Sequence, residues 1–326
     1  MLGPNDVGRR VVVRRRLPDG GLGDVLGELI DCPPGALVVR RADGGDVTVA
    51  VDDVLAGKRV PPRRVSVVEV ENAAALGWRA LECEPLGDWL LRAAGGFTGR
   101  ANSALALGDP GVDLDTALDI VRAFAAHRGL PAKVQVPLPL HARLDGELAD
   151  RGWRQVNPVL VMTAPVGAAW ARTEELSGAR ATRAAQDDVR VSIDSTPAAD
   201  WLTAYHYRGG PLPPEARAVL TNHDRVAFVA VHAGEQVAAI ARAAIDGDFV
   251  GLTAIEVVAA FRRRGLGRRV VAAALGWSQS ATAGAGSEPG PRWAYLQVAE
   301  DNAPAIALYQ QLGFAPHHRY VYRLSP

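Results

Sequence analysis

Two glycines among five arginines mark the first place where the residue types of this sequence could do chemistry. The stretch FRRRGLGRRVVAAAL (261–275) has apolar residues at helical spacing, and it follows DFVGLTAIEVV (248–258), which is apolar and rich in β-branched residues. The order is strand, glycine loop, helix. Such a junction presents unpaired backbone N–H groups and the positive end of a helix dipole, which together bind an anion such as phosphate.

Two better-known phosphate-binding patterns do not fit this loop. The P-loop ends in Gly-Lys-Ser/Thr, which occurs nowhere in the chain, and the dinucleotide fingerprint requires a third small residue where Val270 stands. The pattern that remains is Arg262-x-x-Gly265-x-Gly267.

A second candidate element follows in DNAPAIALYQQLGF (301–314). Asp301 or Asn302 can cap a helix there, and Gly313 can end it. One face of this helix would carry Ala305, Leu308, Tyr309 and Leu312.

Together the two elements resemble motifs A and B of the GNAT N-acetyltransferases. Motif A is Arg/Gln-x-x-Gly-x-Gly/Ala, and motif B is Asn-x-x-Ala-x-x-Leu-Tyr-x-x-x-Gly-Phe, which 302–314 matches at every position. The resemblance covers 189–326, and it covers 65–187 as a degenerate copy. It implies a GNAT α/β (α+β) fold, acetyl-CoA as cosubstrate, and acetyl transfer to an amine of a small molecule or a protein.

The resemblance also implies the roles of individual residues. Backbone N–H groups would hold the CoA pyrophosphate, because glycine at 265 and 267 permits close approach. An N–H at Val257 or Val258 would stabilise the oxyanion, and Tyr309 would protonate the departing thiolate, whose pKa of about 8.5 lies below that of a phenol. The residues placed around acetyl-CoA are Val257, Val258, Arg262, Arg263, Arg264, Gly265, Gly267, Arg268, Asn302 and Tyr309.

The general base has more than one candidate. Some GNATs have a glutamate at the position of Gln297, and a glutamine cannot accept the proton of the amine. Glu256 is the first choice, Glu300 is the second, and His206 could contribute. The segment expected to contact the acceptor contributes Tyr205, His206 and Arg208.

Direct attack of the amine on acetyl-CoA is the expected mechanism, because neither Cys32 nor Cys83 lies in a motif that could carry an acyl group. The alternative function is an acetyl-CoA sensor or scaffold with a non-catalytic GNAT domain, and Gln297 is its best support. Tyr309 and the glycine loop favour the enzyme.

Three predicted domains supply the elements that position these residues. Residues 1–64 alternate valine-rich runs with turn clusters, which predicts a small all-β SH3-like barrel. Residues 65–187, beginning with an expected strand at VSVVEV (65–70), and residues 188–326 both read as α/β.

The last two domains share an order that predicts a tandem repeat. The segments DIVRAFAAHRG, AKVQVP, LHARLDGELADRGW and PVLVMTAP correspond to RRVVAAALGWSQ, AYLQVAE, NAPAIALYQQLGF and RYVYRLSP. The first copy has DPGVDLDTA where the second has its glycine loop, so we predict that the first copy has lost the phosphate cradle.

Composition excludes several other classes. Lys plus Arg and Asp plus Glu both number 36, and the first 65 residues carry eleven basic and nine acidic residues, so a nucleic-acid partner is not indicated. The cysteines lack metal-binding spacing, and we expect no metal. With no membrane-length apolar run and no signal peptide, we expect a cytoplasmic protein whose barrel contacts a partner or the catalytic domain.

Overall fold

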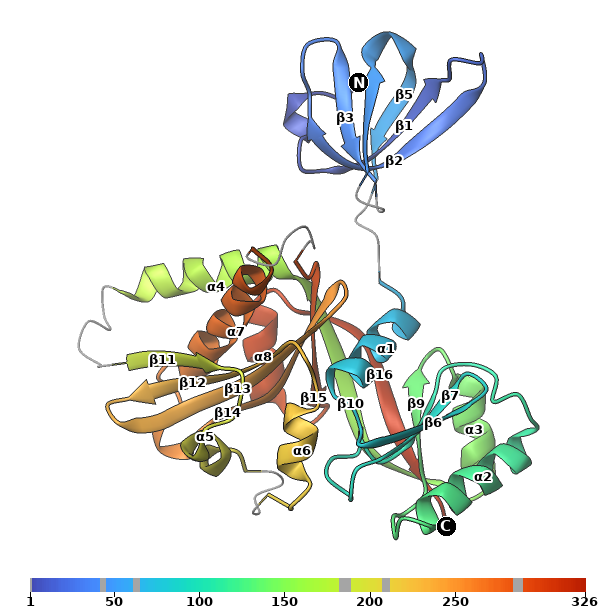
Figure 1. Ribbon diagram of the computed structural model, residues 1–326, viewed down its shortest axis with the longest axis vertical. Coiled ribbons are helices and arrows are strands. Elements are labelled where there is room, and N and C mark those ends of the chain that lie inside the picture. The colour runs from blue at the N-terminus through green and yellow to red at the C-terminus, as the bar shows by residue number, and fades with distance from the viewer. Residues whose placement is uncertain (1, 42–44, 61–64, 182–188, 207–211, 284–289) are drawn as a thin grey trace. The chain divides into compact units, whose positions relative to one another are not determined.

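The computed structural model describes residues 2–41, 45–60, 65–181, 189–206, 212–283 and 290–326 (Figure 1). The chain divides into two compact units, Met1–Val65 and Ser66–Pro326. The second unit contains both predicted α/β domains, so the boundary between 187 and 188 stays a prediction. In the described part of the chain, no helix is both long and apolar enough to cross a membrane.

The first unit is a five-stranded antiparallel sheet in the order β4-β3-β2-β1-β5. Period-two alternation buries Val11 and Val13 of β1 against Leu29 and Val39, while Arg14 and Arg16 are exposed. The prediction of a small all-β N-terminal unit is confirmed. Its elements are two 3-10 turns (Pro4–Asp6 and Val51–Asp53), β1 (Arg10–Arg16), β2 (Leu22–Asp31), β3 (Ala36–Arg40), β4 (Asp46–Ala50) and β5 (Val54–Arg59).

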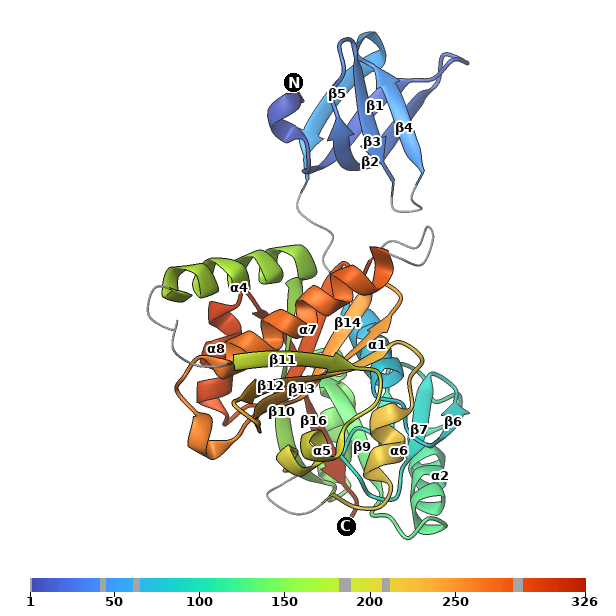
Figure 2. The same cartoon turned by 60° about the vertical axis from the view of Figure 1, so that its left-hand side comes forward.

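The second unit is built on one eleven-stranded sheet in the order β11-β12-β13-β14-β15-β10-β16-β9-β8-β7-β6 (Figures 1 and 2). The strands are β6 (Glu82–Leu86), β7 (Trp89–Ala93), β8 (Ala104–Ala106), β9 (Lys133–Leu138), β10 (Arg154–Pro165), β11 (Val189–Asp194), β12 (Val226–Ala233), β13 (Gln236–Asp246), β14 (Phe249–Val257), β15 (Trp293–Ala299) and β16 (Ala315–Leu324). The helices are α1 (Val67–Gly77), α2 (Leu114–Ala126), α3 (Ala142–Asp150), α4 (Val166–Ala181), α5 (Ala199–Ala204), α6 (Ala216–Thr221), α7 (Leu266–Ala283) and α8 (Ala303–Gln311), with a 3-10 turn at Ala259–Phe261.

The predicted tandem repeat is visible in the strand directions. The two parallel pairs are β8 with β9 and β14 with β15, and each is joined by a helical crossover, α2 or α7. Each then continues into a helix and an antiparallel strand. We call Ala104–Pro165 (β8-α2-β9-α3-β10) the first repeat and Phe249–Leu324 (β14-α7-β15-α8-β16) the second repeat.

The two repeats exchange their last strands. β10, the end of the first repeat, lies between β15 and β16 of the second, whereas β16 lies between β10 and β9. The two repeats therefore form a single sheet, and neither completes its part of the sheet alone.

The helices α3 and α8 end in the same way, which fixes the correspondence of the repeats. Each is followed by a glycine with positive φ, Gly152 (78°) or Gly313 (87°). The next N–H donates back to the carbonyl of Leu148 or Tyr309 at 3.0 Å, the hydrogen bond of a Schellman motif. Leu148 of the first repeat therefore stands where the second repeat has Tyr309.

The expected strand at 65–70 is wrong, because these residues begin helix α1. Ser66 Oγ accepts from the N–H of Glu69, and a carboxylate oxygen of Glu69 accepts from the N–H of Ser66, which is a reciprocal capping box. This local signal outweighs the β-branched residues of VSVVEV. The helix buries Glu71, which accepts hydrogen bonds from Gln135 on β9 and pairs with His318 on β16.

Two hydrophobic cores lie on opposite faces of the part of the sheet that carries the second repeat. Residues of α4, α7 and α8 pack on one face around Val270, Leu275 and Leu312. Residues of α5 and α6 pack with Trp78 and Phe97 on the other face. Strand β14 thus lies between a core that positions α7 and a core that positions α5.

Candidate active site at the end of strand β14

An opening between β14 and β15 is the first component of the site. The two strands are paired over Phe249–Leu252 with Trp293–Leu296, and β14 then continues to Val257 with no partner on this side among the described residues. The N–H of Val258 donates to Ala238 of β13 at 2.9 Å. Because hydrogen-bonding direction alternates along an antiparallel strand, the N–H of Val257 faces the opening. Of the two predicted oxyanion donors, only Val257 is therefore available.

A β-bulge determines where Glu256 points. The register passes from Arg242↔Thr253 to Ile240↔Glu256, so β14 has one extra residue, and Ala254 takes a φ of 49°. Ile255 and Val257 consequently pack toward α7, whereas Ala254 packs toward α5. Glu256 therefore points to the same side as Ala254, toward α5. In a strand without the bulge, Glu256 would point to the opposite side, toward α7.

On that side Glu256 meets His206, just after α5. The backbone N–H of His206 donates to Oε2 of Glu256 at 2.9 Å, and Nδ1 lies 3.0 Å from Oε1. The Glu256 side chain is 23% exposed, and that of His206 is 53% exposed. Tyr205 packs edge-on to Phe97 and tilted against Trp201, so it anchors the backbone before His206. Arg208 lies outside the described residues.

The glycine loop at the start of α7 takes the conformation that its residues predicted. Arg263 and Gly265 have φ values of 65° and 84°, and a Cβ at Gly267 would lie 3.1 Å from Leu308 and 3.4 Å from Val257. The N–H groups of residues 263–267 find no acceptor among the described residues. These N–H groups are the unpaired donors at a helix N-terminus that bind an anion.

The arginines of this loop differ in what they contact. Arg262 Nε donates to Val257 O at 3.2 Å, and the guanidinium of Arg264 lies 5.5 Å from the ring centre of Phe261. Arg268 is turned away, because its side chain donates to Leu176 O on α4 at 3.0 Å and its N–H donates to Gly265 O. The exposed arginines beside the loop are therefore Arg262, Arg263, Arg264 and Arg269.

Helix α8 brings the second motif beside the loop. Asn302 caps it, because Oδ1 accepts from the N–H of Ala305 at 3.3 Å. Tyr309 packs in the α7 core against Phe314, with ring centres 6.3 Å apart, and burial raises its pKa to about 12. Glu300, the second candidate base, lies 3.8 Å from Arg319 on β16.

Two residues missed by the sequence interpretation reach Gln297 on β15. Arg100, in the loop between β7 and β8, donates from NH1 to Oε1 of Gln297 at 2.7 Å, and Tyr320 donates to the same oxygen at 3.2 Å. The guanidinium of Arg100 also stacks 4.9 Å from the ring centre of Trp78. These contacts join segments far apart in sequence, and no local motif around Arg100 signals them.

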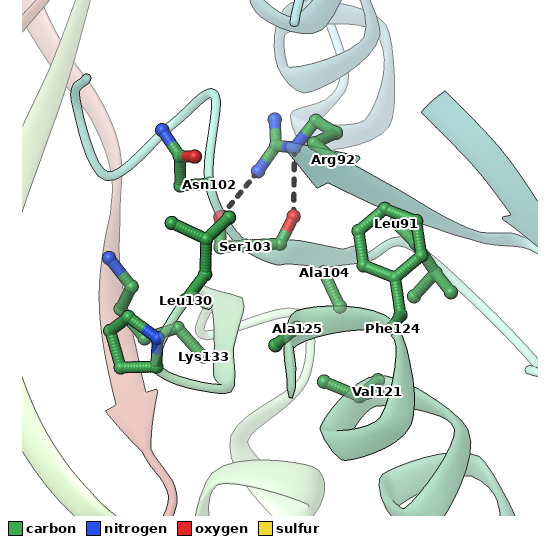
Figure 3. A pocket seen from close by; sticks show the side chains of 11 residues that line it. Leu91, Arg92, Asn102, Ser103, Ala104, Val121, Phe124, Ala125, Leu130 and Lys133 are labelled. Atoms are coloured by element: carbon green, nitrogen blue, oxygen red, sulfur yellow. Dashed lines mark hydrogen bonds between the residues drawn. The ribbon is translucent and has the colours of Figure 1, made fainter. Parts of the chain in front are cut away.

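A small cavity lies beside the C-terminal half of α2 (Figure 3). Its volume is about 10 Å³, and Arg92 and Ser103, which are hydrogen-bonded to each other, are among the residues that line it. This space holds about one water molecule. Across the described parts of the chain, no cluster of three or more His, Cys, Asp or Glu residues could hold a metal.

Comparison with known families places both units. Residues 65–323 match the family "Probable histone acetyltransferase Rv0428c C-terminal", and residues 5–58 match "Rv0428c N-terminal Sm-like domain". The small all-β unit, for which we predicted an SH3-like barrel, is thus described as Sm-like in that family.

Individual relatives agree with the family match. The probable histone acetyltransferase Rv0428c of Mycobacterium tuberculosis is 32% identical over 97% of this chain and 94% of its own length. The uncharacterized N-acetyltransferase YobR of Bacillus subtilis is 26% identical over 79% of this chain and 98% of its own. A solved GCN5-related N-acetyltransferase from Kribbella flavida has the same fold, with a TM-score of 0.57 at 18% identity over 79% of this chain and 95% of that chain.

Proposed function

The chain belongs to the GNAT N-acetyltransferases, in the family of the probable histone acetyltransferase Rv0428c, and from this premise we propose that it transfers an acetyl group from acetyl-CoA to an amine. Acetyltransferase activity is the function that the names of its relatives support. The proposal adds acetyl-CoA as the donor, an amine as the acceptor and the roles of individual residues.

The observation that carries the proposal is the row of N–H groups at residues 263–267, which donate to no acceptor in the described structure. A pyrophosphate fits this row because Gly265 takes a positive φ and Gly267 has no side chain between Leu308 and Val257. Arg263 and Arg264 add exposed positive charge.

The reacting end of the donor would then lie in the opening between β14 and β15. The N–H of Val257 is the donor for the oxygen that becomes negative when the amine attacks the carbonyl carbon. Tyr309 supplies the proton for the departing sulfur, and its raised pKa keeps the phenol protonated throughout the neutral range.

Direct attack is the mechanism that we propose, without an acetylated enzyme. Cys32 lies in the first unit and Cys83 on β6, and neither belongs to the residues gathered around β14. Accumulation of acetylated protein with acetyl-CoA alone would contradict this mechanism.

The test is release of free thiol from acetyl-CoA across a panel of small amines, lysine peptides and aminoglycosides, with wild type and Tyr309→Phe side by side. We expect acceptor-dependent release that slows about 10²- to 10⁴-fold in Tyr309→Phe, the order expected for loss of a general acid. Calorimetry should show unchanged affinity for acetyl-CoA. Binding without release from any acceptor would instead favour a non-catalytic sensor.

A further inference from the structure

The imidazole of His206 has a defined tautomer. Its Nδ1 lies 3.0 Å from the carbonyl oxygen of Ala204 and 3.0 Å from Oε1 of Glu256. A carbonyl oxygen and an ionised carboxylate can only accept, so Nδ1 must carry the hydrogen. In the neutral ring, Nε2 therefore has the lone pair, and this tautomer is assigned from the hydrogen-bond network.

Glu256 and His206 are not equivalent candidates for a base. Both carboxylate oxygens of Glu256 accept from His206, one from the ring and one from the backbone N–H. Across the ring, Nε2 makes no hydrogen bond to a described residue, and about half of the His206 side chain is exposed. The nitrogen that can take up a proton thus belongs to the more exposed of the two side chains.

The remaining candidate base, Glu300, lies beside Arg319. Gln297, at the position where some GNATs have a glutamate, is an amide that is held by Arg100 and Tyr320. Within the described structure, Glu256 is the charged residue that hydrogen-bonds to His206, and it comes from the strand that leads to Val257.

We propose that His206 is the general base of acetyl transfer and that Glu256 is its positioning residue, which holds the ring in the Nδ1–H tautomer. This assignment rests on the proposed function and reverses the roles predicted from the sequence. It gives the β-bulge at Ala254 a purpose, because the bulge turns Glu256 toward His206.

The reaction balances as follows. His206 Nε2 takes a proton from the acceptor ammonium, and the freed amine nitrogen forms a bond to the thioester carbonyl carbon. The tetrahedral adduct loses one of its two N–H protons to water. The C–S bond then breaks, its electron pair leaves with sulfur, and Tyr309 donates a proton to the thiolate. Tyr309 is reprotonated from solvent, and His206 releases its proton. The net reaction converts ammonium and acetyl-CoA into amide, CoA thiol and one proton.

The experiment is the pH dependence of kcat/KM for wild type, His206→Gln and Glu256→Gln with the best acceptor amine. His127→Gln is a matched control, because His127 also binds a backbone carbonyl through Nδ1 but lies at the end of α2. Wild type and the control should show an acidic limb in the pH profile, because a protonated Nε2 cannot take the proton of the acceptor amine. His206→Gln should lose this limb and about 10²- to 10⁴-fold of kcat/KM.

Glu256→Gln should keep the limb with a smaller loss of rate, because the histidine remains. Imidazole added to His206→Ala should restore part of the activity. Nitrogen-15 NMR of the free protein should find the Nδ1–H form in wild type.

Loss of all activity in Glu256→Gln, with the limb intact in His206→Gln, would reverse the assignment. The assignment would also be overturned if the neutral imidazole of His206 in wild type carried its hydrogen on Nε2 instead of Nδ1. No acetyl transfer by wild type would overturn the proposed function itself, which is a different result from transfer that His206→Gln leaves unchanged.

Discussion

Helices α2 and α7 occupy the same place in the two repeats, and they begin in opposite ways. At α2, Asp113 caps the helix and accepts from the N–H of Thr116 at 3.0 Å and from its hydroxyl at 2.6 Å. At α7, residues 263–267 leave their N–H groups without an acceptor in the described structure, and arginines surround them. The N-terminus of α2 is thus capped by a carboxylate of the chain itself. The N-terminus of α7 is open to an anion that binds from solution.

A second difference between the repeats lies in the helices α3 and α8. Leu148 fills the hydrophobic core of the first repeat at the position where the second repeat has Tyr309. The first repeat thus has the same frame without the groups to which we assign chemistry in the second repeat. If the proposed function is correct, the topology fixes where a cosubstrate can lie, whereas a few side chains decide whether it binds.

The most severe test of this comparison separates the repeats. A fragment of residues 189–326 lacks β10, which stands between β15 and β16, and we expect it not to fold. A fragment of residues 66–326 keeps the whole second unit and should unfold cooperatively. Circular dichroism and two-dimensional NMR measure both fragments, and a cooperative thermal transition in 189–326 would show that the exchanged strand is dispensable.

The next test places a carboxylate at each helix start. Gly267→Glu puts a negative charge where the pyrophosphate would lie, and like charges in contact cost several kcal/mol, so acetyl-CoA should bind at least about 100-fold more weakly. Val112→Glu adds the same group beside the cap of α2, at a side chain that is 40% exposed, and should leave binding unchanged. Calorimetry compares the two variants, and equal losses would refute the electrostatic distinction.

The smallest expected effect concerns the cap itself. Asp113→Ala removes the acceptor at the start of α2 and should lower the Tm of the second unit by about 2–4 °C, with acetyl-CoA affinity unchanged. The hydrogen bond from the hydroxyl of Thr116, followed by that from its N–H, lowers the pKa of Asp113 below its ordinary value.

The sign of the pH dependence follows from that lowered pKa. The contribution of Asp113 is complete above the ordinary pKa of an aspartate and is lost as the pH falls through the lowered value. The difference in Tm between wild type and Asp113→Ala should therefore be constant from pH 7 to pH 5 and shrink below about pH 4. A scanning calorimeter measures it, and a difference that grows in acid would contradict the role of the ionised cap.

The elements that carry the motifs could be predicted because their signals are local. The strand expected at 248–258 is observed at Phe249–Val257, and the helix that follows the glycine loop begins at Leu266. Asn302 and Gly313 bound helix α8 as predicted. The capping box at Ser66 and Glu69 was an equally local signal, and the β-branched residues around it led to the wrong element.

The rest depends on contacts that no short pattern encodes. The bulge at Ala254 has no glycine or proline to mark it, yet it decides which face Glu256 takes. Arg100 and Gln297 are 197 residues apart in sequence. The neighbouring strands β10 and β16 are likewise far apart in the chain. Such choices are made by the packing of the whole sheet.

The exchanged strands also determine when the sheet can be completed during synthesis of the protein. During synthesis, β10 leaves the ribosome long before β15 and β16, its two neighbours, have been made. The final strand, Ala315–Leu324, pairs with both β9 and β10, so these two strands gain this partner only when the end of the chain has been made. We therefore expect the sheet to be completed only after translation has ended, with unpaired strand edges exposed until then, which are the edges on which nascent chains aggregate.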